Sequence, residues 1–428
     1  MKSMFNRTIR WLGLATGLAV LSIAPAQAET TLEVLHAWPG DHGNYQPLAD
    51  AFMKAHPDVR VEFRVSPPNY NEANLVVTRN AMTGNLPDVY FSGFSVLRPL
   101  VTTLKARGQA VPLTPFIGAE SKEWLEQNYS PAILSLGQVD GVQYGIPFNA
   151  STPIVYYNAD LVTKAGADPD HFPSDWEGVI ALARKINALG GDVRGMNYSV
   201  GSLESDWLWQ AAILERGGAI LTKDEKAVGY DNILGLETLR FLRHIAEATD
   251  MDVATAQNSY KELFFAGKLG FYITSPSSVR SFMQTIGDRF AMRTAPYPLI
   301  DRVSGRLPSG GNAAVILAKD PEKQKLAWEF VKFVTGPGAQ AQIAEATGYM
   351  PTNKKASDLL GPFYSSNPNY ATAATQTGIA GSWYAYPGST GVEIWRAQRD
   401  VIDLVQRGKL SPEDGLKRIA TKTADLLK

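Results

Sequence analysis

The chain has 428 residues, of which 45% are hydrophobic, a formal net charge of −1 at pH 7 and no cysteine. A charge so close to zero favours neither nucleic acid nor an anionic membrane surface, so neither is expected as a partner. Without cysteine there is neither a disulfide framework nor a thiol for lipid attachment, so packing must supply the stability.

The first residues have the pattern of a secretory signal peptide. A basic start is followed by an apolar stretch over residues 11–23 and by small residues at 26–28, which provide a cleavage signal. The apolar stretch is too short for a membrane span, which needs roughly 18 or more apolar residues. We therefore predict that residues 1–28 are removed and that the mature chain, long enough for two lobes, is secreted to the periplasm.

Strand and helix patterns alternate in the next part of the chain. We expect strands over residues 30–38, 59–66 and 86–93, and helices over residues 45–57 and 71–82. Gly84 follows the second helix and is typical of a helix end. Such an alternation predicts a mainly parallel sheet with helices on both faces.

Residues 144–166 are expected to carry the chain from one lobe to the other. Pro147 favours extended backbone, and the β-branched and aromatic run at 154–157 has strand character. The polar insert between them includes Asn149 and Ser151, whose side chains are suited to meeting a ligand at a lobe crossing. An ordinary interior strand with a polar turn explains this segment equally well.

Helical patterns dominate the remainder of the chain and are separated by short strands. A Gly- and Pro-rich stretch over 296–311 is expected to form a second crossing between lobes. The other expected elements are helices over residues 176–189, 207–215, 233–248, 259–266, 323–335, 393–406 and 412–427, and strands over residues 268–274 and 313–318.

Several motifs in one order make the chain similar to a known family. They are TGNLPDVYFSG, FFAGKLGFYITSPSS, GGNAAVI, GYMPTNKKA and GKLSPEDGLKRI, together with the signal peptide and the crossover. In this order they resemble the extracellular solute-binding proteins of ABC importers, the family that includes maltose-binding and glycerol-3-phosphate-binding proteins. The resemblance implies an α/β fold of two lobes, each a helix-covered, mainly parallel sheet, joined by a multi-crossing hinge.

The resemblance also implies domain limits and a function. The N-terminal lobe would comprise residues 29–147 and 309–347, and the C-terminal lobe residues 148–308 and 348–428. The protein would be a monomer that captures a sugar, glycoside or polyol in the periplasm and delivers it to a membrane permease, without a cofactor or catalysis.

Two tryptophans carry the expected preference for sugar. Trp207 and Trp395 stand where the resemblance places the stacking residues of maltose binders, and Arg396 stands next to the place of a phosphate-binding arginine. An indole offers an apolar face to a pyranose, whereas a guanidinium grips an anion in bidentate fashion. Glycerol-3-phosphate or another anionic glycoside, bound by Arg396, is therefore the alternative ligand.

Other candidate ligand contacts come from strand ends and from the same resemblance. His36, Trp38 and Asp41 follow the first strand, where open α/β sheets bind ligands. Phe94 and Ser95 follow the third strand, at the place where, by the resemblance, glycerophosphate binders have an acidic residue. The remaining candidates present hydroxyl, amide or backbone groups, and turn capping or core packing explains several of them equally well: Tyr70, Asn149, Ser151, Ser275, Ser277, Gly311 and Tyr349.

Catalysis is the main rival interpretation. His36 and His42 flank Asp41, but the other histidines are scattered, so a hydrogen-bonded turn explains them better than a metal site. The sequence has neither a nucleophile elbow nor a phosphate-binding glycine loop. A glycosidase needs two facing carboxylates, for which Glu204 and Asp206 are one pair, so a secreted glycoside-processing enzyme remains the competing class. The sequence is silent on a chemoreceptor role.

Overall fold

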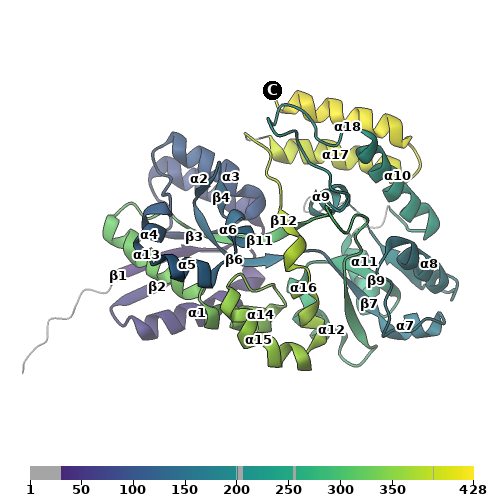
Figure 1. Cartoon of the computed structure of the whole chain (residues 1–428), viewed down its shortest axis with the longest axis horizontal. Coiled ribbons are helices and arrows are strands. Elements are labelled where there is room, and N and C mark those ends of the chain that lie inside the picture. The colour runs from purple at the N-terminus through teal and green to yellow at the C-terminus, as the bar shows by residue number, and fades with distance from the viewer. Residues whose placement is uncertain (1–29, 199, 201–205, 254–256, 389) are drawn as a thin grey trace, which may run out of the picture.

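The computed structural model describes residues 30–198, 200, 206–253, 257–388 and 390–428 (Figure 1). The signal peptide expected at 1–28 and Glu204 lie outside the described residues. Two sheets, each covered by helices, form separate parts of the molecule, and several chain segments pass between them. The expected α/β class is confirmed. Among the described residues, no helix has the length and apolar character needed to cross a bilayer.

The first sheet has the strand order β12-β11-β3-β1-β2, and β6 also pairs with β11. β1 pairs in parallel with β2 and β3, whereas β11 is antiparallel to β3 and β6 and parallel to β12. The strands are β1 (Thr30–Leu35), β2 (Val59–Phe63), β3 (Val89–Gly93), β6 (Gly145–Ser151), β11 (Leu307–Ile316) and β12 (Ala380–Ser382).

Both faces of this sheet are apolar because helices cover both. In β1, Leu32 and Val34 belong to one buried cluster and Leu35 to another, as the two-residue period of a strand requires. The first cluster is completed by α1 (His42–Ala55) and α13 (Pro321–Val334), and the second by α2 (Tyr70–Thr83) and α3 (Phe94–Ala106). The Gly84 prediction is confirmed, since that residue caps α2 with a φ of 72°.

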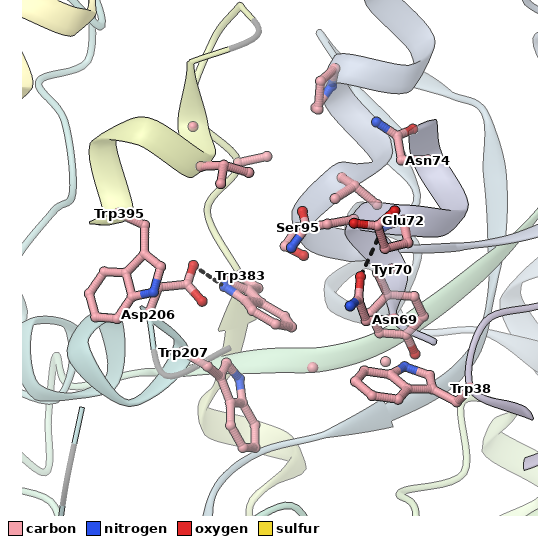
Figure 2. Close-up of a pocket in the computed structure, with 18 of the residues that line it drawn as sticks. Trp38, Asn69, Tyr70, Glu72, Asn74, Ser95, Asp206, Trp207, Trp383 and Trp395 are labelled. Atoms are coloured by element: carbon pink, nitrogen blue, oxygen red, sulfur yellow. Dashed lines mark hydrogen bonds between the residues drawn. The ribbon is translucent and has the colours of Figure 1, made fainter. Parts of the chain in front are cut away.

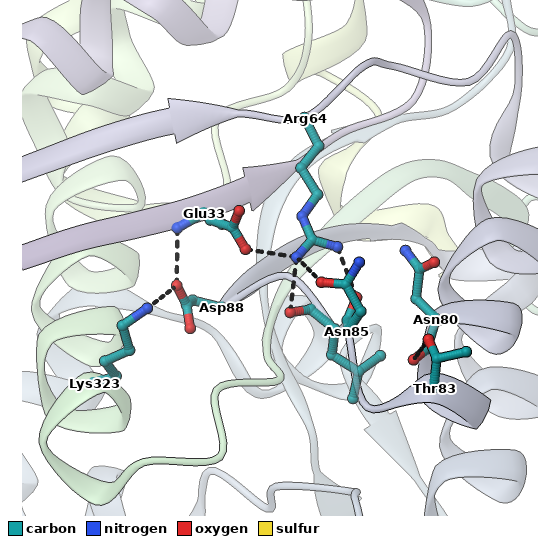
Figure 3. Close-up of polar contacts among 8 residues, drawn as sticks. Glu33, Arg64, Asn80, Thr83, Asn85, Asp88 and Lys323 are labelled. Atoms are coloured by element: carbon teal, nitrogen blue, oxygen red, sulfur yellow. Dashed lines mark hydrogen bonds and ion pairs between the residues drawn. The ribbon is translucent and has the colours of Figure 1, made fainter.

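A polar network ties the first sheet to α13 (Figure 3). The Asp88 carboxylate accepts hydrogen bonds from the Glu33 backbone N–H and from Lys323 Nζ, both at 2.9 Å. Arg64 contacts the Glu33 carboxylate at 2.5 Å and donates to the Asn85 carbonyl at 2.8 Å. Because charge-assisted bonds are the stronger ones, this network fixes β1, β3 and α13 as one body.

The second sheet has the order β10-β7-β9-β8. β7 (Ile154–Asn158) is antiparallel to both β9 (Leu269–Thr274) and β10 (Met292–Pro296), and only β8 (Arg194–Asn197) is parallel to β9. The expectation of a mainly parallel sheet is therefore wrong for this part. β7 enters directly from β6 of the first sheet and β10 leads back toward β11, so these two strands run in opposite directions.

One large apolar cluster fills the second part. Side chains cap the starts of its helices: Asp175 accepts from the Gly178 N–H, and Asn232 accepts from the N–H groups of Leu234 and Gly235. The helices are α7 (Ala159–Lys164), α8 (Trp176–Asn187), α9 (Asp206–Leu214), α10 (Ile233–Ala248), α11 (Gln257–Phe265), α12 (Val279–Ile286), α16 (Pro368–Ala374), α17 (Gly391–Gln406) and α18 (Pro412–Leu426).

The segments that link the two parts are strands as well as loops. β6 and β11 pair with each other, and each runs across an expected lobe boundary, at 147/148 and at 308/309. α15 (Lys354–Ser366), which the expected limits assign to the C-terminal lobe, packs against α14 (Pro337–Thr347) and α5 (Lys122–Asn128).

The elements not yet named are α4 (Thr114–Ala119), α6 (Pro131–Ser135), β4 (Gln138–Val139), β5 (Val142–Gln143) and three 3-10 turns, η1 (Pro39–Asp41), η2 (Pro276–Ser278) and η3 (Thr377–Ile379).

Candidate functional site

A cavity of about 1400 Å³ lies between the two parts of the molecule. Its first wall comes from η1, α2 and α3, and its second wall from α9, η2, α17 and the segment before α17. Twelve of the fifteen residues expected to contact ligand line it: Trp38, Asp41, Tyr70, Ser95, Ser151, Trp207, Ser275, Ser277, Gly311, Tyr349, Trp395 and Arg396.

Trp38 and Tyr70 form the aromatic part of the first wall (Figure 2). Their rings meet edge to face, with centroids 5.9 Å apart. Tyr70 opens α2, and its hydroxyl accepts from Asn312 Nδ2 at 3.3 Å. Its ring lies directly against Gly93, where an added Cβ would be 2.4 Å from Tyr70 Cγ. Trp38 has a φ of 64°, which is rare for a bulky residue and marks a position held by its surroundings.

Asp41 adds a half-buried carboxylate to this wall. Burial raises the pKa of its carboxyl to about 6, because a charged carboxylate is poorly solvated there. Among the described residues, no hydrogen bond to this carboxylate is present, and its side chain does not cap α1. A ligand hydroxyl in the cavity would supply the missing donor.

The second wall carries Trp207, Trp383 and Trp395, facing the first wall across the cavity (Figure 2). The Trp207 indole donates to the Pro308 carbonyl at 2.8 Å, which fixes the ring over β11. Trp383 donates to Asp206 Oδ2 at 3.0 Å, and its ring lies 6.2 Å from that of Trp207. Three indoles are thereby held on one side of the cavity.

These tryptophans differ in how much surface they offer. Trp207 is 8% and Trp395 only 4% exposed, so most of each ring is covered by protein. Trp383 is half-buried and therefore offers more of its ring to a ligand. Trp209, two residues from Trp207, packs into the core against Tyr230, as expected for the opposite side of a helix.

The strands that link the two parts form the floor of the cavity. In the β6–β11 pair, Gly310 lies opposite Ser151, and an added Cβ on Gly311 would be 2.3 Å from the Asn149 carbonyl oxygen. Ser275 caps η2 and accepts from the Ser277 hydroxyl at 2.9 Å. The floor therefore presents serine hydroxyl groups and the backbone of the two glycines to the cavity.

Three predicted residues lie away from the cavity wall. His36 is fully buried, stacks on Tyr45 with centroids 4.2 Å apart and lies 3.2 Å from His42. Phe94 is buried in the apolar cluster of the second part. The Asn149 side chain accepts from the backbone N–H of Asn312, so it holds β11 instead of facing the cavity. Within the described residues, no group of His, Asp and Glu has the geometry of a metal site.

Two further residues of the site have weak signals in the sequence. Trp383, Tyr384 and Tyr386 form an aromatic cluster before Pro387, from which one ring is expected to cap the cleft, and Asp206 is indicated only as one of many acids. Asp206 and Trp383 are 177 residues apart, and their hydrogen bond joins α9 to the segment before α17. Only the aromatic density of residues 383–386 signalled this wall.

The cationic side chains of the cavity lie toward solvent. Arg107 and Arg396 are exposed, and Lys261 lies over the ring of Phe265. The two half-buried acids, Asp41 and Asp206, lie on opposite walls. The site thus combines aromatic faces with oxygen acceptors, which suits a polyhydroxylated or cationic ligand better than an anionic one.

A family model identifies the family of this chain, and similar proteins and structures accompany it. Residues 47–372 match the bacterial extracellular solute-binding proteins. The chain is 26% identical to a Brucella abortus protein named only as a binding protein, over 97% of this chain and 98% of that one. It is 27% identical to the sn-glycerol-3-phosphate-binding periplasmic protein UgpB of Escherichia coli, over 85% and 83%. Its fold matches the cyclic α-maltosyl-1,6-maltose binding protein of Arthrobacter globiformis with a TM-score of 0.78 at 21% identity, over 93% and 99%.

Proposed function

The chain belongs to the bacterial extracellular solute-binding proteins, and on this premise we propose that it captures a neutral sugar or glycoside for import by an ABC permease. The observation that carries this proposal is the cavity between two aromatic walls, with Trp38 and Tyr70 facing Trp207 and Trp383. Aromatic faces supply apolar contact to sugar rings, and the serines and carboxylates of the cavity orient hydroxyls.

The alternative ligand is glycerol-3-phosphate or another anionic glycoside. The 27% identity to a glycerol-3-phosphate-binding protein and the position of Arg396 in the cavity wall favour it. Against it stands the charge of the interior, because Asp41 and Asp206 would repel a phosphate while the arginines lie exposed at the rim. We therefore rank the neutral ligand first.

Isothermal titration calorimetry with a panel of solutes tests whether the protein prefers a neutral ligand to an anionic one. The panel contains maltose, maltotriose, trehalose, glucosamine, glycerol-3-phosphate and glycerophosphocholine. We expect a one-to-one complex with at least one neutral sugar and no heat with glycerol-3-phosphate. Binding of glycerol-3-phosphate alone, abolished by Arg396→Gln, would overturn the neutral-ligand proposal. Product formation during the titration would indicate the glycoside-processing enzyme instead.

The periplasm is the proposed compartment. The named UgpB relative is a periplasmic protein, and the basic and apolar start of the chain has the pattern of a signal peptide. Mass spectrometry of protein recovered from the periplasm of an expressing cell tests this, with an N-terminus at Glu29 as the expected result. The same sample, kept native, identifies any solute that co-purifies.

A further inference from the structure

An ion pair joins the two parts of the molecule beside the cavity. Arg98 lies on α3, the helix that supplies Ser95 to the first wall, and Glu225 lies in the turn between α9 and α10. The two guanidinium nitrogens of Arg98 lie 2.6 Å and 2.7 Å from the two carboxylate oxygens of Glu225. This bidentate arrangement is the strongest geometry available to an arginine and a carboxylate.

The backbone at Glu225 holds its carboxylate in this place. Glu225 has a φ of 57°, which is uncommon for a residue other than glycine. Its N–H donates to the Thr222 carbonyl at 2.8 Å, and the Thr222 hydroxyl donates to the Asp224 carboxylate at 2.7 Å. A non-glycine residue in this conformation persists only when its surroundings fix it.

Glu225 is also connected to the second wall of the cavity. The Tyr384 hydroxyl donates to Glu225 Oε1 at 2.6 Å. The Tyr384 N–H donates to Gln210 Oε1 at 2.8 Å, and Gln210 Nε2 donates back to the Tyr384 carbonyl at 3.1 Å. Trp383, the most available indole of the second wall, is the preceding residue, so a shift of Glu225 relative to α9 would move the segment that carries Trp383.

The cavity is wide in the conformation that has this ion pair. Its volume of about 1400 Å³ is larger than the roughly 300–1,000 Å³ of pockets that enclose a small ligand. The Arg98 and Glu225 side chains are 25% and 31% exposed, so they are partly shielded from solvent but still subject to screening by salt. The pair is formed at this spacing of the two walls and therefore stabilises it.

We propose that Glu225 is a positioning residue that holds the two walls at this spacing through Arg98 and aligns the second wall through Tyr384. A solute that closes the cavity must overcome this contact, so Glu225 sets how tightly solute binds. The claim about the spacing of the walls does not depend on which solute binds, whereas the claim about affinity rests on the proposed function.

Distance measurements on solute-free protein test the first part. Because the natural chain has no cysteine, Val65→Cys and Val303→Cys provide single labelling sites, at residues 93% and 88% exposed. We expect Glu225→Gln to shift the inter-label distance distribution, because a neutral amide cannot hold the Arg98 guanidinium as the carboxylate does. Glu413→Gln, which removes an exposed ion pair with Arg240, is the matched control and should change nothing. An unchanged distribution in Glu225→Gln would overturn the proposal.

Affinity measurements test the second part with a neutral sugar from the panel. In the natural protein, Kd should fall as NaCl is raised from 20 mM to 500 mM, because salt screens the ion pair and an uncharged sugar has no charge of its own to screen. Glu225→Gln should bind at least threefold more tightly at low salt and lose this salt dependence. Weaker binding in Glu225→Gln would assign the pair to the closed state and overturn the proposal. If no panel sugar binds, the proposed function fails, while the distance measurement still decides the role of Glu225.

Discussion

The tryptophans of the second wall both pack in the apolar core and line the cavity. Trp395 is 4% exposed and belongs to the large apolar cluster of the second part, yet it also lines the cavity. Truncating such a ring removes ligand contact and leaves a void in the core. A binding test at this position therefore needs a control that creates a void without touching the cavity.

Trp395→Ala should weaken binding of a neutral panel sugar by about 10- to 100-fold, which corresponds to about 1.4–2.8 kcal/mol. It should also lower the unfolding free energy by about 3–5 kcal/mol, as for other large-to-small core changes. Trp209→Ala is the matched control, since Trp209 is fully buried away from the cavity and should lose stability but keep affinity. Calorimetry below the unfolding transition measures the affinity, and urea unfolding measures the stability. Equal affinity losses in both variants would remove the case for Trp395 as a sugar platform.

Asp41 gives the solute-free protein a pH-dependent loss of stability. Its carboxyl pKa is about 6 in the folded protein, above the usual 3.8. The folded state therefore favours the protonated form, and the stability that this provides is fully present below pH 4 and is lost as pH rises through 6. Asp41→Asn should thus be more stable than the natural protein at pH 8 but not at pH 4. The gain should be about 1–2 kcal/mol, below the roughly 3 kcal/mol of the full pKa shift, because the side chain is partly exposed.

Urea unfolding at pH 4 and pH 8 measures this difference. Asp58→Asn removes an exposed carboxylate from the same part of the molecule and is the control. If Asp41→Asn were destabilised equally at both pH values, the carboxylate would make a favourable contact in the folded state instead of being poorly solvated.

At the scale of elements, β11 is the strand on which the cavity depends. It pairs with β3, β6 and β12, and its register with β6 shifts between Asn312 and Ala313, so that Phe148 lies in a bulge. Gly311, next to this shift, has a φ of 117°. The close approach of Gly311 to the backbone of Asn149 leaves no room for a side chain.

Gly311→Ala should therefore lower the unfolding free energy by about 2–4 kcal/mol, because the new Cβ adds backbone strain and a clash with a main-chain oxygen that is difficult to move. Gly338→Ala is the control, since Gly338 lies exposed in α14 and is followed by Ala339, and an added Cβ there would meet no side chain from elsewhere in the chain within 4 Å. That change should stabilise the protein by about 0.5–1 kcal/mol. Equal stability of the two variants in thermal unfolding would contradict the packing described for β11.

Elements with strong local signals could be predicted from the sequence. The helix expected over 233–248 has these bounds in the structure, because Asn232 caps its start and its apolar residues follow one face. Strand directions in the second sheet could not be predicted, because they depend on where the chain enters from the first sheet. The polar insert of residues 149–152 is largely part of β6, since Asn149 and Ser151 find partners across β11 that local sequence does not reveal.

The same distinction applies to the candidate site. Residues at strand ends and helix starts, such as Trp38 and Tyr70, could be proposed because their positions follow from local elements. His36 has an equally suitable position, but its ring turns inward onto Tyr45 and Phe63, which belong to later elements. The Asp206–Trp383 contact joins residues too far apart in the chain for any local pattern to indicate it.

At the scale of the whole molecule, the two walls of the cavity belong to two parts that are linked by paired strands. We therefore predict that one solute molecule, by binding both walls, both narrows the cavity and stabilises the fold. A solute at 100 times its Kd should raise the unfolding free energy by about 2.7 kcal/mol and reduce the radius of gyration in small-angle scattering, since bridging both walls favours the narrower state. Trp395→Ala, tested at the same sugar concentration, should show smaller changes in both. Stabilisation with an unchanged radius of gyration would mean that solute binds one wall alone, and the facing aromatic surfaces would then lose their proposed role.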